Sequence, residues 1–187
     1  MTIPSLGADG LLPPGRYSAT MAEIERAFVS GRSPERQVLW DRFTQYTRTW
    51  EAIERETGTD GRILLGYWIG GSFISAEPKP TDVDCSPILH TARLEGLRTK
   101  QAYGRAKRLI QDRDSVKRHF SVEVFPMRWC PVKSGLSIGS CSEAERHYLG
   151  VRGGLDTWWQ RNRPPGVNRA PELPSHQPER GYVEVIL

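Results

Sequence analysis

The segment from Ser33 to Gly58 constrains the fold most, because its apolar residues follow the period of a long amphipathic helix. Ser33-Pro34 is a helix start signal, with the proline at the first helical position, and Gly58 favours an end near Thr57. Within these limits one apolar stripe recurs at spacings of four, three, four and three residues: Leu39, Phe43, Tyr46, Trp50 and Ile53. We expect this stripe to lie in a core, with a seam for a partner helix as the alternative.

Four further helices are expected, over residues 21–29, 93–111 and 153–163 and for one or two turns after Ser142. Two of them begin with a capping box, in which Thr20 pairs with Glu23 and Ser142 pairs with Glu145. A capping box satisfies two backbone N–H groups at the start of a helix, so it marks that start in a sequence.

Four apolar or alternating segments predict strands, over residues 62–71, 82–89, 119–127 and 181–187. In the third of these, Phe120, Val122 and Val124 share one face and Glu123 lies on the other. Five prolines between Arg163 and Arg180 predict an irregular crossing before the last strand. This order of elements predicts an α/β (α+β) fold, with a small mixed β-sheet flanked by helices.

Composition narrows the class of protein. The chain is 37% hydrophobic and 26% charged, which is typical of a soluble globular protein, and it contains neither a secretory signal nor a segment as long as a membrane span. Cys85, Cys130 and Cys141 lack the spacing of metal ligands, so we expect reduced thiols in a cytoplasmic protein. The four histidines also lack ligand spacing, so zinc is not expected.

Positive charge is concentrated in one part of the chain. The net charge is +4, and the window from Arg98 to His119 holds eight basic and two acidic residues, which gives 8 − 2 = +6 for the window and −2 for the remainder. A local basic patch of this kind indicates an anionic ligand. A solvated helix face is the alternative.

Asp82 and Asp84 lie two positions apart in a predicted strand, so their side chains project to the same face. Adjacent carboxylates raise each other's pKa unless a cation lies between them. Mg²⁺ is the natural partner, because it binds carboxylate oxygens and keeps other positions for water and phosphate. A second Mg²⁺ would require one more acid. Glu123, a charged residue in an apolar strand, is the best candidate, and a solvent-facing glutamate is the alternative.

Gly70-Gly71-Ser72 closes the apolar segment ahead of these acids. Glycines at the end of a strand let the backbone approach a phosphate and turn its N–H groups toward it. The Ser72 hydroxyl adds one donor, and Lys79 is the only cation in the loop that follows. Taken by itself, Gly-Gly-Ser is also compatible with an ordinary turn.

Together, the buried strand, the Gly-Gly-Ser corner, the interval of ten residues, the Asp-x-Asp strand and the later acid resemble the signature of the polymerase β-like nucleotidyltransferase superfamily. The match covers Ile69 to Cys85, with Glu123 as a third point. The flanking sequences also look like those of a group of small, free-standing bacterial proteins with this motif. The resemblance implies a nucleotidyltransferase-like domain with helices mainly on one side of the sheet. It assigns catalysis and two Mg²⁺ ions to Asp82, Asp84 and Glu123, and NTP binding to Gly70, Gly71, Ser72 and Lys79.

The activity implied is Mg²⁺-dependent transfer of a nucleoside monophosphate from an NTP to the hydroxyl of an RNA end, a protein or a small molecule. One alternative is a catalytically weak nucleotide- or partner-binding member of a toxin–antitoxin or stress module, acting with a cognate partner protein. Another is a nucleic-acid-binding domain that uses the basic window. One domain is expected over residues 1–187, with a helical N-terminal part (1–60), a catalytic core (61–130) and an irregular C-terminal extension (131–187).

Two further groups of residues are candidates for the nucleotide. Arg93, Lys100 and Lys107 could supply additional contacts to the triphosphate. Trp158 and Trp159 could stack on a nucleoside, although packing in the core is the plainer interpretation.

Overall fold

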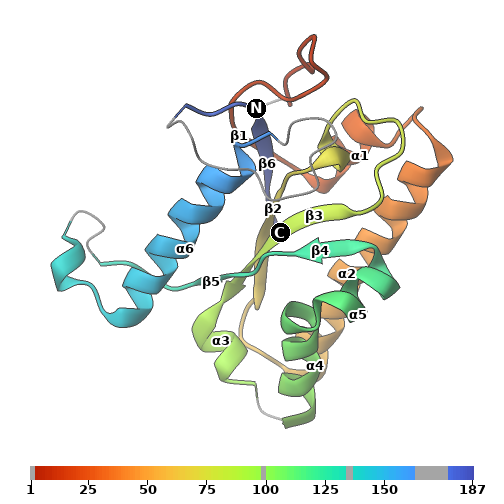
Figure 1. Cartoon of the computed structure of the whole chain (residues 1–187). Helices are drawn as coiled ribbons and strands as arrows, with labels where there is room; N and C mark the ends of the chain where they lie inside the picture. The colour runs from red at the N-terminus through yellow and green to blue at the C-terminus, as the bar shows by residue number, and fades with distance from the viewer. Residues whose placement is uncertain (1–2, 98–99, 134–136, 163–176) are drawn as a thin grey trace.

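The computed structural model describes residues 3–97, 100–133, 137–162 and 177–187. Its sheet is formed by β1 (Gly15–Ala19), β2 (Leu64–Ile69), β3 (Val83–His90), β4 (Val122–Val124), β5 (Met127–Trp129) and β6 (Gly181–Ile186). The strand order is β1-β6-β2-β3-β4, and β5 also pairs with β3. The last strand of the chain therefore lies between the first and the second, parallel to β1 and antiparallel to β2 (Figure 1).

The α-helices of the described residues are α1 (Met21–Phe28), α2 (Pro34–Thr57), α3 (Thr91–Glu95), α4 (Lys100–Gln111), α5 (Arg113–Phe120) and α6 (Glu143–Trp159). The described residues also form two short 3₁₀ helices, η1 (Ser72–Ile74) and η2 (Ile138–Ser140). The mixed sheet flanked by helices confirms the α+β class that the sequence predicts. The starts of α1 and α2 are also confirmed, as is the end of α2, where Gly58 adopts a left-handed conformation with φ 57°.

The apolar stripe of α2 lies in the core, as predicted, where it packs against β2. Phe43, Tyr46 and Trp50 are fully buried, and the ring centroid of Phe43 lies 4.9 Å from that of Tyr67 in β2. The Tyr67 hydroxyl is 3.0 Å from the hydroxyl of Thr47, which keeps this polar atom paired inside the core. Burial of each large apolar side chain contributes about 1.5–3 kcal/mol, so this contact fixes α2 against the sheet.

The two faces of the sheet are covered by different helices. Tyr67 points toward α2, whereas its neighbour Trp68 points to the other face, where the guanidinium of Arg152 in α6 lies 5.7 Å from its ring. On that same face, Trp159 Nε1 donates to Ser86 Oγ at 3.0 Å. Figure 1 shows α2, α4 and α5 on one side of the sheet and α6 on the other. Helices thus predominate on one side, and α6 adds a cover over part of the opposite face.

The prediction of one helix over residues 93–111 was wrong. The structure has two helices, since α3 ends at Glu95 and α4 begins at Lys100. Gly96 caps α3, and its backbone N–H donates to the carbonyl of Ala92. Glycine is unfavourable inside a helix and favourable at its end, so the signal for this break was present at Gly96.

The strand predicted over residues 119–127 was too long, and α5 was missed. His119 and Phe120 belong to α5, whose first turn is capped by Asp112 through a 3.1 Å bond from the backbone N–H of Ser115. Ser121 then adopts a left-handed conformation with φ 51°, and β4 starts one residue later. A short alternating segment does not reveal where its periodicity begins, so tertiary context decided this boundary.

The C-terminal extension is more regular than predicted. A single helix of 17 residues, α6, replaces the two short helices expected there. It continues through Gly150, Gly153 and Gly154, each of which costs about 1 kcal/mol relative to alanine, because its packing on the sheet offsets that loss. The last strand is confirmed as β6, whereas β1 and β5 were not predicted. Of the predicted irregular crossing, residues 163–176 lie outside the described residues.

Two predictions from composition can be compared with the structure. All three cysteines are free thiols, and Cys85 and Cys141 are buried. In the part of the chain that the structure describes, no helix is both long and apolar enough to cross a lipid bilayer.

A buried arginine ties the loop after β2 to the N-terminal helices. Arg36 of α2 is 1% exposed, and its guanidinium donates to four backbone carbonyls at 2.5–3.0 Å: those of Phe28, Phe73, Ser75 and Glu77. Three of these carbonyls belong to residues 73–77, which follow the Gly-Gly-Ser corner. A planar guanidinium with five donors suits this position, because one side chain can satisfy several buried carbonyls together.

Replacement of this arginine should destabilise the fold strongly. We expect Arg36→Met to lower the free energy of unfolding by about 3–5 kcal/mol, because the carbonyls that it satisfies lose their donors while they remain buried. Urea denaturation followed by circular dichroism measures this change. Arg48→Met, at an exposed position of the same helix, is the control and should change the value by less than about 0.5 kcal/mol. Equal effects of the two substitutions would contradict the assignment.

Candidate functional site

Three acidic side chains converge where β3 begins and β4 runs beside it. Asp82 directly precedes β3, and Asp84 lies in it. The parallel register of β3 and β4 places Glu123 opposite Asp84. Since side chains alternate along a strand, Asp84 shares its face with Ser86, on the side of the sheet that α6 covers. The structure therefore brings together the three acids that the sequence singles out.

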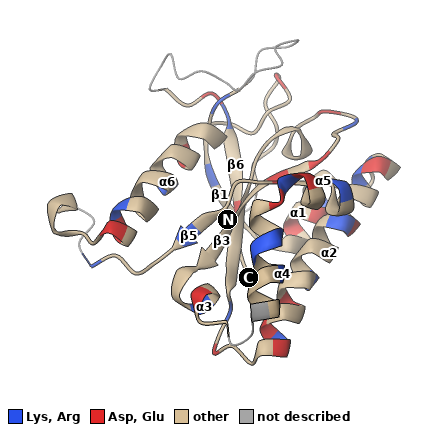
Figure 2. Cartoon of the chain, turned by 60° about the horizontal axis from the view of Figure 1, so that its bottom comes forward, with Lys and Arg blue, Asp and Glu red and all other residues tan. Residues whose placement is uncertain are grey.

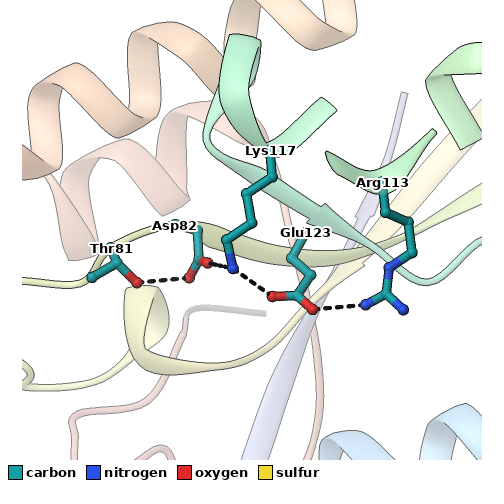
Figure 3. A network of polar contacts seen from close by, with 5 residues as sticks. All are labelled: Thr81, Asp82, Arg113, Lys117 and Glu123. Atoms are coloured by element: carbon teal, nitrogen blue, oxygen red, sulfur yellow. Dashed lines mark hydrogen bonds and ion pairs between the residues drawn. The ribbon is translucent and has the colours of Figure 1, made fainter. Parts of the chain in front are cut away.

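Lys117 of α5 joins two of these acids. Its Nζ lies 2.6 Å from Asp82 Oδ2 and 2.9 Å from Glu123 Oε2 (Figure 3). The second oxygen of Asp82 accepts a 3.2 Å hydrogen bond from the Thr81 hydroxyl. These bonds raise the pKa of Lys117 above its usual value, the bond to Asp82 first and the bond to Glu123 second, so the side chain stays a cation. Lys117 thus neutralises part of the repulsion between the acids.

Arg113, one turn earlier in α5, holds Glu123 from the other side. Its NH2 lies 2.7 Å from Glu123 Oε1 (Figure 3), and its guanidinium carbon lies 4.7 Å from the ring centroid of Phe125. Partial burial disfavours the charged form of Glu123, but the bonds and charges of Lys117 and Arg113 outweigh it and hold the pKa of this carboxyl below its usual value. Glu123 is therefore ionised at neutral pH.

Asp84 differs from its two neighbours. Burial, followed by the charges of Asp82 and Glu123, raises the pKa of Asp84 to about 7, and the charges of Lys117 and Arg180 oppose this only in part. Among the described residues, its carboxylate makes no hydrogen bond or ion pair. A buried, unpaired carboxylate beside two other acids is an unfavourable arrangement unless another cation can approach it.

The Gly-Gly-Ser corner lies directly against Asp84. The Gly70 backbone N–H donates to the Asp84 carbonyl at 3.1 Å. Gly71 adopts φ 69° and ψ −164°, a region that is essentially restricted to glycine. A Cβ at Gly71 would lie 1.9 Å from Asp84 Oδ2. The side chain of Arg180, 7% exposed, donates to the Gly71 carbonyl at 2.7 Å. Only glycine therefore allows the corner and the carboxylate to lie this close.

Ser72 and Lys79 are the remaining predicted binding residues. Ser72 is partly exposed and begins η1, directly after the corner. Lys79 lies in the exposed loop before β3, where its backbone N–H donates to Glu77 and its charge acts on Glu35. In the described part of the chain Lys79 forms no ion pair with the acids, whose cationic partners come from α5.

The donor chemistry of the three acids fits a hard divalent cation, although their present arrangement does not form a ready metal site. Carboxylate oxygens are the ligands that Mg²⁺ prefers, and the unpaired, crowded state of Asp84 is what such a cation would relieve. Among the described residues, however, no group of three His, Cys, Asp or Glu side chains is placed to hold a metal ion. The ammonium of Lys117 lies between Asp82 and Glu123 and pairs with both.

Sequence reasoning missed the basic residues that contact the acids. Arg113 and Lys117 lie four positions apart on α5, and the Asp112 cap could have indicated that helix. No local pattern indicated a role for Arg180. This residue directly precedes β6, and it reaches the corner only because the sheet places β6 beside β2.

Of the other candidate cations, Arg93 and Lys107 make contacts away from the acids. Arg93 donates to the Arg62 carbonyl, and Lys107 lies 5.8 Å from the ring centroid of Tyr103; the side chain of Lys100 is not among those described. Acidic residues are interspersed with basic ones on α2 and α5 (Figure 2), whereas the sequence of α4 contains basic residues and no acid. Trp159 is 4% exposed and packs in the core, and Trp158 is half-buried against that core, as the plainer interpretation predicts.

Fold and site together define a small α+β protein in which a cluster of three acids lies at a glycine corner of a mixed sheet. A model described as a family of unknown function (DUF6932) matches residues 4–186, and the chain belongs to that family. Neither the curated proteins nor the solved structures contain a significant match.

A substitution at Gly71 tests the close approach of the corner to Asp84. We expect Gly71→Ala to lower the free energy of unfolding by about 2–4 kcal/mol, through backbone strain and the clash with the carboxylate. Gly31→Ala is the control, because Gly31 has a similar φ of 70° and nothing within 4 Å of an added Cβ; it should lose about 1 kcal/mol. Chemical denaturation measures both. Similar losses in the two variants would show that Asp84 does not lie against the corner.

Proposed function

We propose that this protein is a Mg²⁺-dependent nucleotidyltransferase, which moves a nucleoside monophosphate from an NTP to an acceptor hydroxyl. The observation that carries the proposal is the convergence of Asp82, Asp84 and Glu123 at a glycine corner that leaves no room for a side chain. Each feature is common by itself. Their combination in the order in which the superfamily signature has them supports the proposal.

The corner would hold the triphosphate. Gly71 has no side chain to obstruct a phosphate, and the partly exposed Ser72 adds a hydroxyl donor. Arg180 binds the Gly71 carbonyl, which orients the peptide that follows it. Lys79 in the adjacent loop, with its exposed side chain, would meet the outer phosphates.

The acids would serve the reacting centre. Asp82, Asp84 and Glu123 would hold the Mg²⁺ ions, which when bound neutralise charge on the triphosphate and on the leaving pyrophosphate. Glu123 would accept the proton of the acceptor hydroxyl as that oxygen forms its bond to the α-phosphorus and the bond from this phosphorus to pyrophosphate breaks. Its lowered pKa keeps Glu123 ionised and able to accept this proton.

A labelling assay tests this function. Purified protein is incubated with Mg²⁺, each α-³²P-labelled NTP, and extracts that contain RNA, proteins and small molecules. We expect label transfer that falls by at least about a hundredfold in Glu123→Gln, which keeps the shape of the side chain and removes its basicity, and that is lost in Asp84→Asn. Asp41→Asn, at an exposed acid on α2, should transfer label at the normal rate.

The same experiment distinguishes the alternatives. Tight binding of an NTP or of a partner protein without transfer would contradict the enzyme and support a binding member of a stress or toxin–antitoxin module. Binding of RNA that survives Asp84→Asn and is lost in Lys107→Gln would instead indicate a nucleic-acid-binding domain.

A further inference from the structure

We propose that Lys117 is an internal counter-ion of the acid cluster, and that a divalent cation must displace it in order to bind. The proposal rests on the proposed function, because it concerns the metal centre of the same site. It assigns to α5 a role in setting the affinity of that centre for metal.

The position of the Lys117 ammonium is the first argument. It lies 2.6 Å from an oxygen of Asp82 and 2.9 Å from an oxygen of Glu123, so it bridges acids that enter from two neighbouring strands. These are the oxygens that a metal ion shared by the acids would need. The other oxygen of Asp82 accepts from Thr81 and that of Glu123 pairs with Arg113, so a metal ion and the ammonium compete for the same two oxygens.

The charge of the cluster is the second argument. Asp82, Asp84 and Glu123 carry up to three negative charges, and only Lys117 and Arg113 form ion pairs with them among the described residues. Asp84 therefore stays without an ionic partner. A divalent cation in place of the ammonium would supply one further positive charge to this cluster of three acids, so the exchange is electrostatically favourable.

The contacts of the two side chains, not their exposure, distinguish Lys117 from Arg113. Both side chains are 50% exposed, but the guanidinium of Arg113 also lies over the ring of Phe125 and binds Glu123 alone. The Lys117 side chain has four flexible carbons and no contact of this kind among the described residues, so its ammonium can turn to solvent or to a bound anion. Lys117 is the cation that leaves, and Arg113 keeps Glu123 oriented.

Direct metal binding tests the proposal without an activity assay. Free Mn²⁺ is measured by electron paramagnetic resonance during titration of the full chain. We expect Lys117→Met to bind Mn²⁺ about tenfold more tightly than the wild type, the size expected when two partly exposed ion pairs no longer compete. Arg118→Met, which removes the same charge from an exposed position of α5, should stay within about twofold. Lys117→Gln provides a second variant if the methionine disturbs folding.

Displacement itself can be followed in the wild-type protein. Lysines are acetylated with a water-soluble reagent and analysed by mass spectrometry, with and without Mg²⁺. An ammonium that bridges two carboxylates reacts slowly, so Mg²⁺ should accelerate the acetylation of Lys117. Lys107 is the control, because it has no carboxylate partner among the described residues, and its rate of acetylation should not change.

The outcomes separate this inference from the proposed function. One possible result is that the wild type binds Mn²⁺, that Asp84→Asn abolishes this binding and that Lys117→Met does not tighten it. The metal centre would then be supported, but Lys117 would not compete with the metal. Acetylation of Lys117 that Mg²⁺ leaves unchanged would likewise show that the metal does not displace the ammonium. If neither the wild type nor Lys117→Met binds Mn²⁺, both the metal centre and the inference are overturned.

Discussion

The parallel pairing of β3 with β4 is the contact on which the site depends. It places Glu123 opposite Asp84, and a shift of one residue would turn Glu123 to the face covered by α2, because strand side chains alternate. Ser121 secures the register at the start of β4. Its carbonyl accepts the backbone N–H of Val83 at 2.9 Å, and its hydroxyl accepts a 2.7 Å bond from Arg42 of α2. The left-handed φ of 51° at Ser121 lets the chain reverse from α5 into the strand within one residue. Ser121 thus connects the packing of α2 on the sheet to the placement of the acids.

The crowding of the three acids is electrostatically unfavourable. A core of the same shape would be more stable without three crowded carboxylates, since burial and like charges together raise the pKa of Asp84 to about 7. Two cations of α5 offset part of the repulsion, but both are half exposed, so water screens their stabilising effect. Folded proteins concentrate such unfavourable groups where a ligand will later compensate them. The acid cluster matches that description, whereas the buried Arg36, whose carbonyl partners are all supplied by the chain itself, is a purely structural group.

Sequence reasoning succeeded where a local pattern determines structure. The α2 stripe and the Thr20 and Ser142 capping boxes follow from periodicity and from hydrogen bonds within a few residues. It failed where distant contacts decide. The segment at β1 has little local strand signal and becomes a strand because β6 pairs with it across almost the whole chain. Likewise α6 remains one helix through three glycines because the sheet supports it, and Lys117 meets the acids only once α5 replaces the start of the predicted strand.

The length of the side chain at position 123 connects these observations. The Glu123 carboxylate receives Lys117 at one oxygen and Arg113 at the other. An aspartate on the same backbone would end one methylene nearer the strand, and the two cations, which start from successive turns of α5, would have to extend further to reach it. A glutamate thus suits a position from which one carboxylate must contact both cations of α5. An aspartate would therefore weaken the contacts by which this carboxylate holds Lys117 and Arg113 together. The choice of Glu at this position therefore favours a cluster whose charge is partly balanced by the cations of α5.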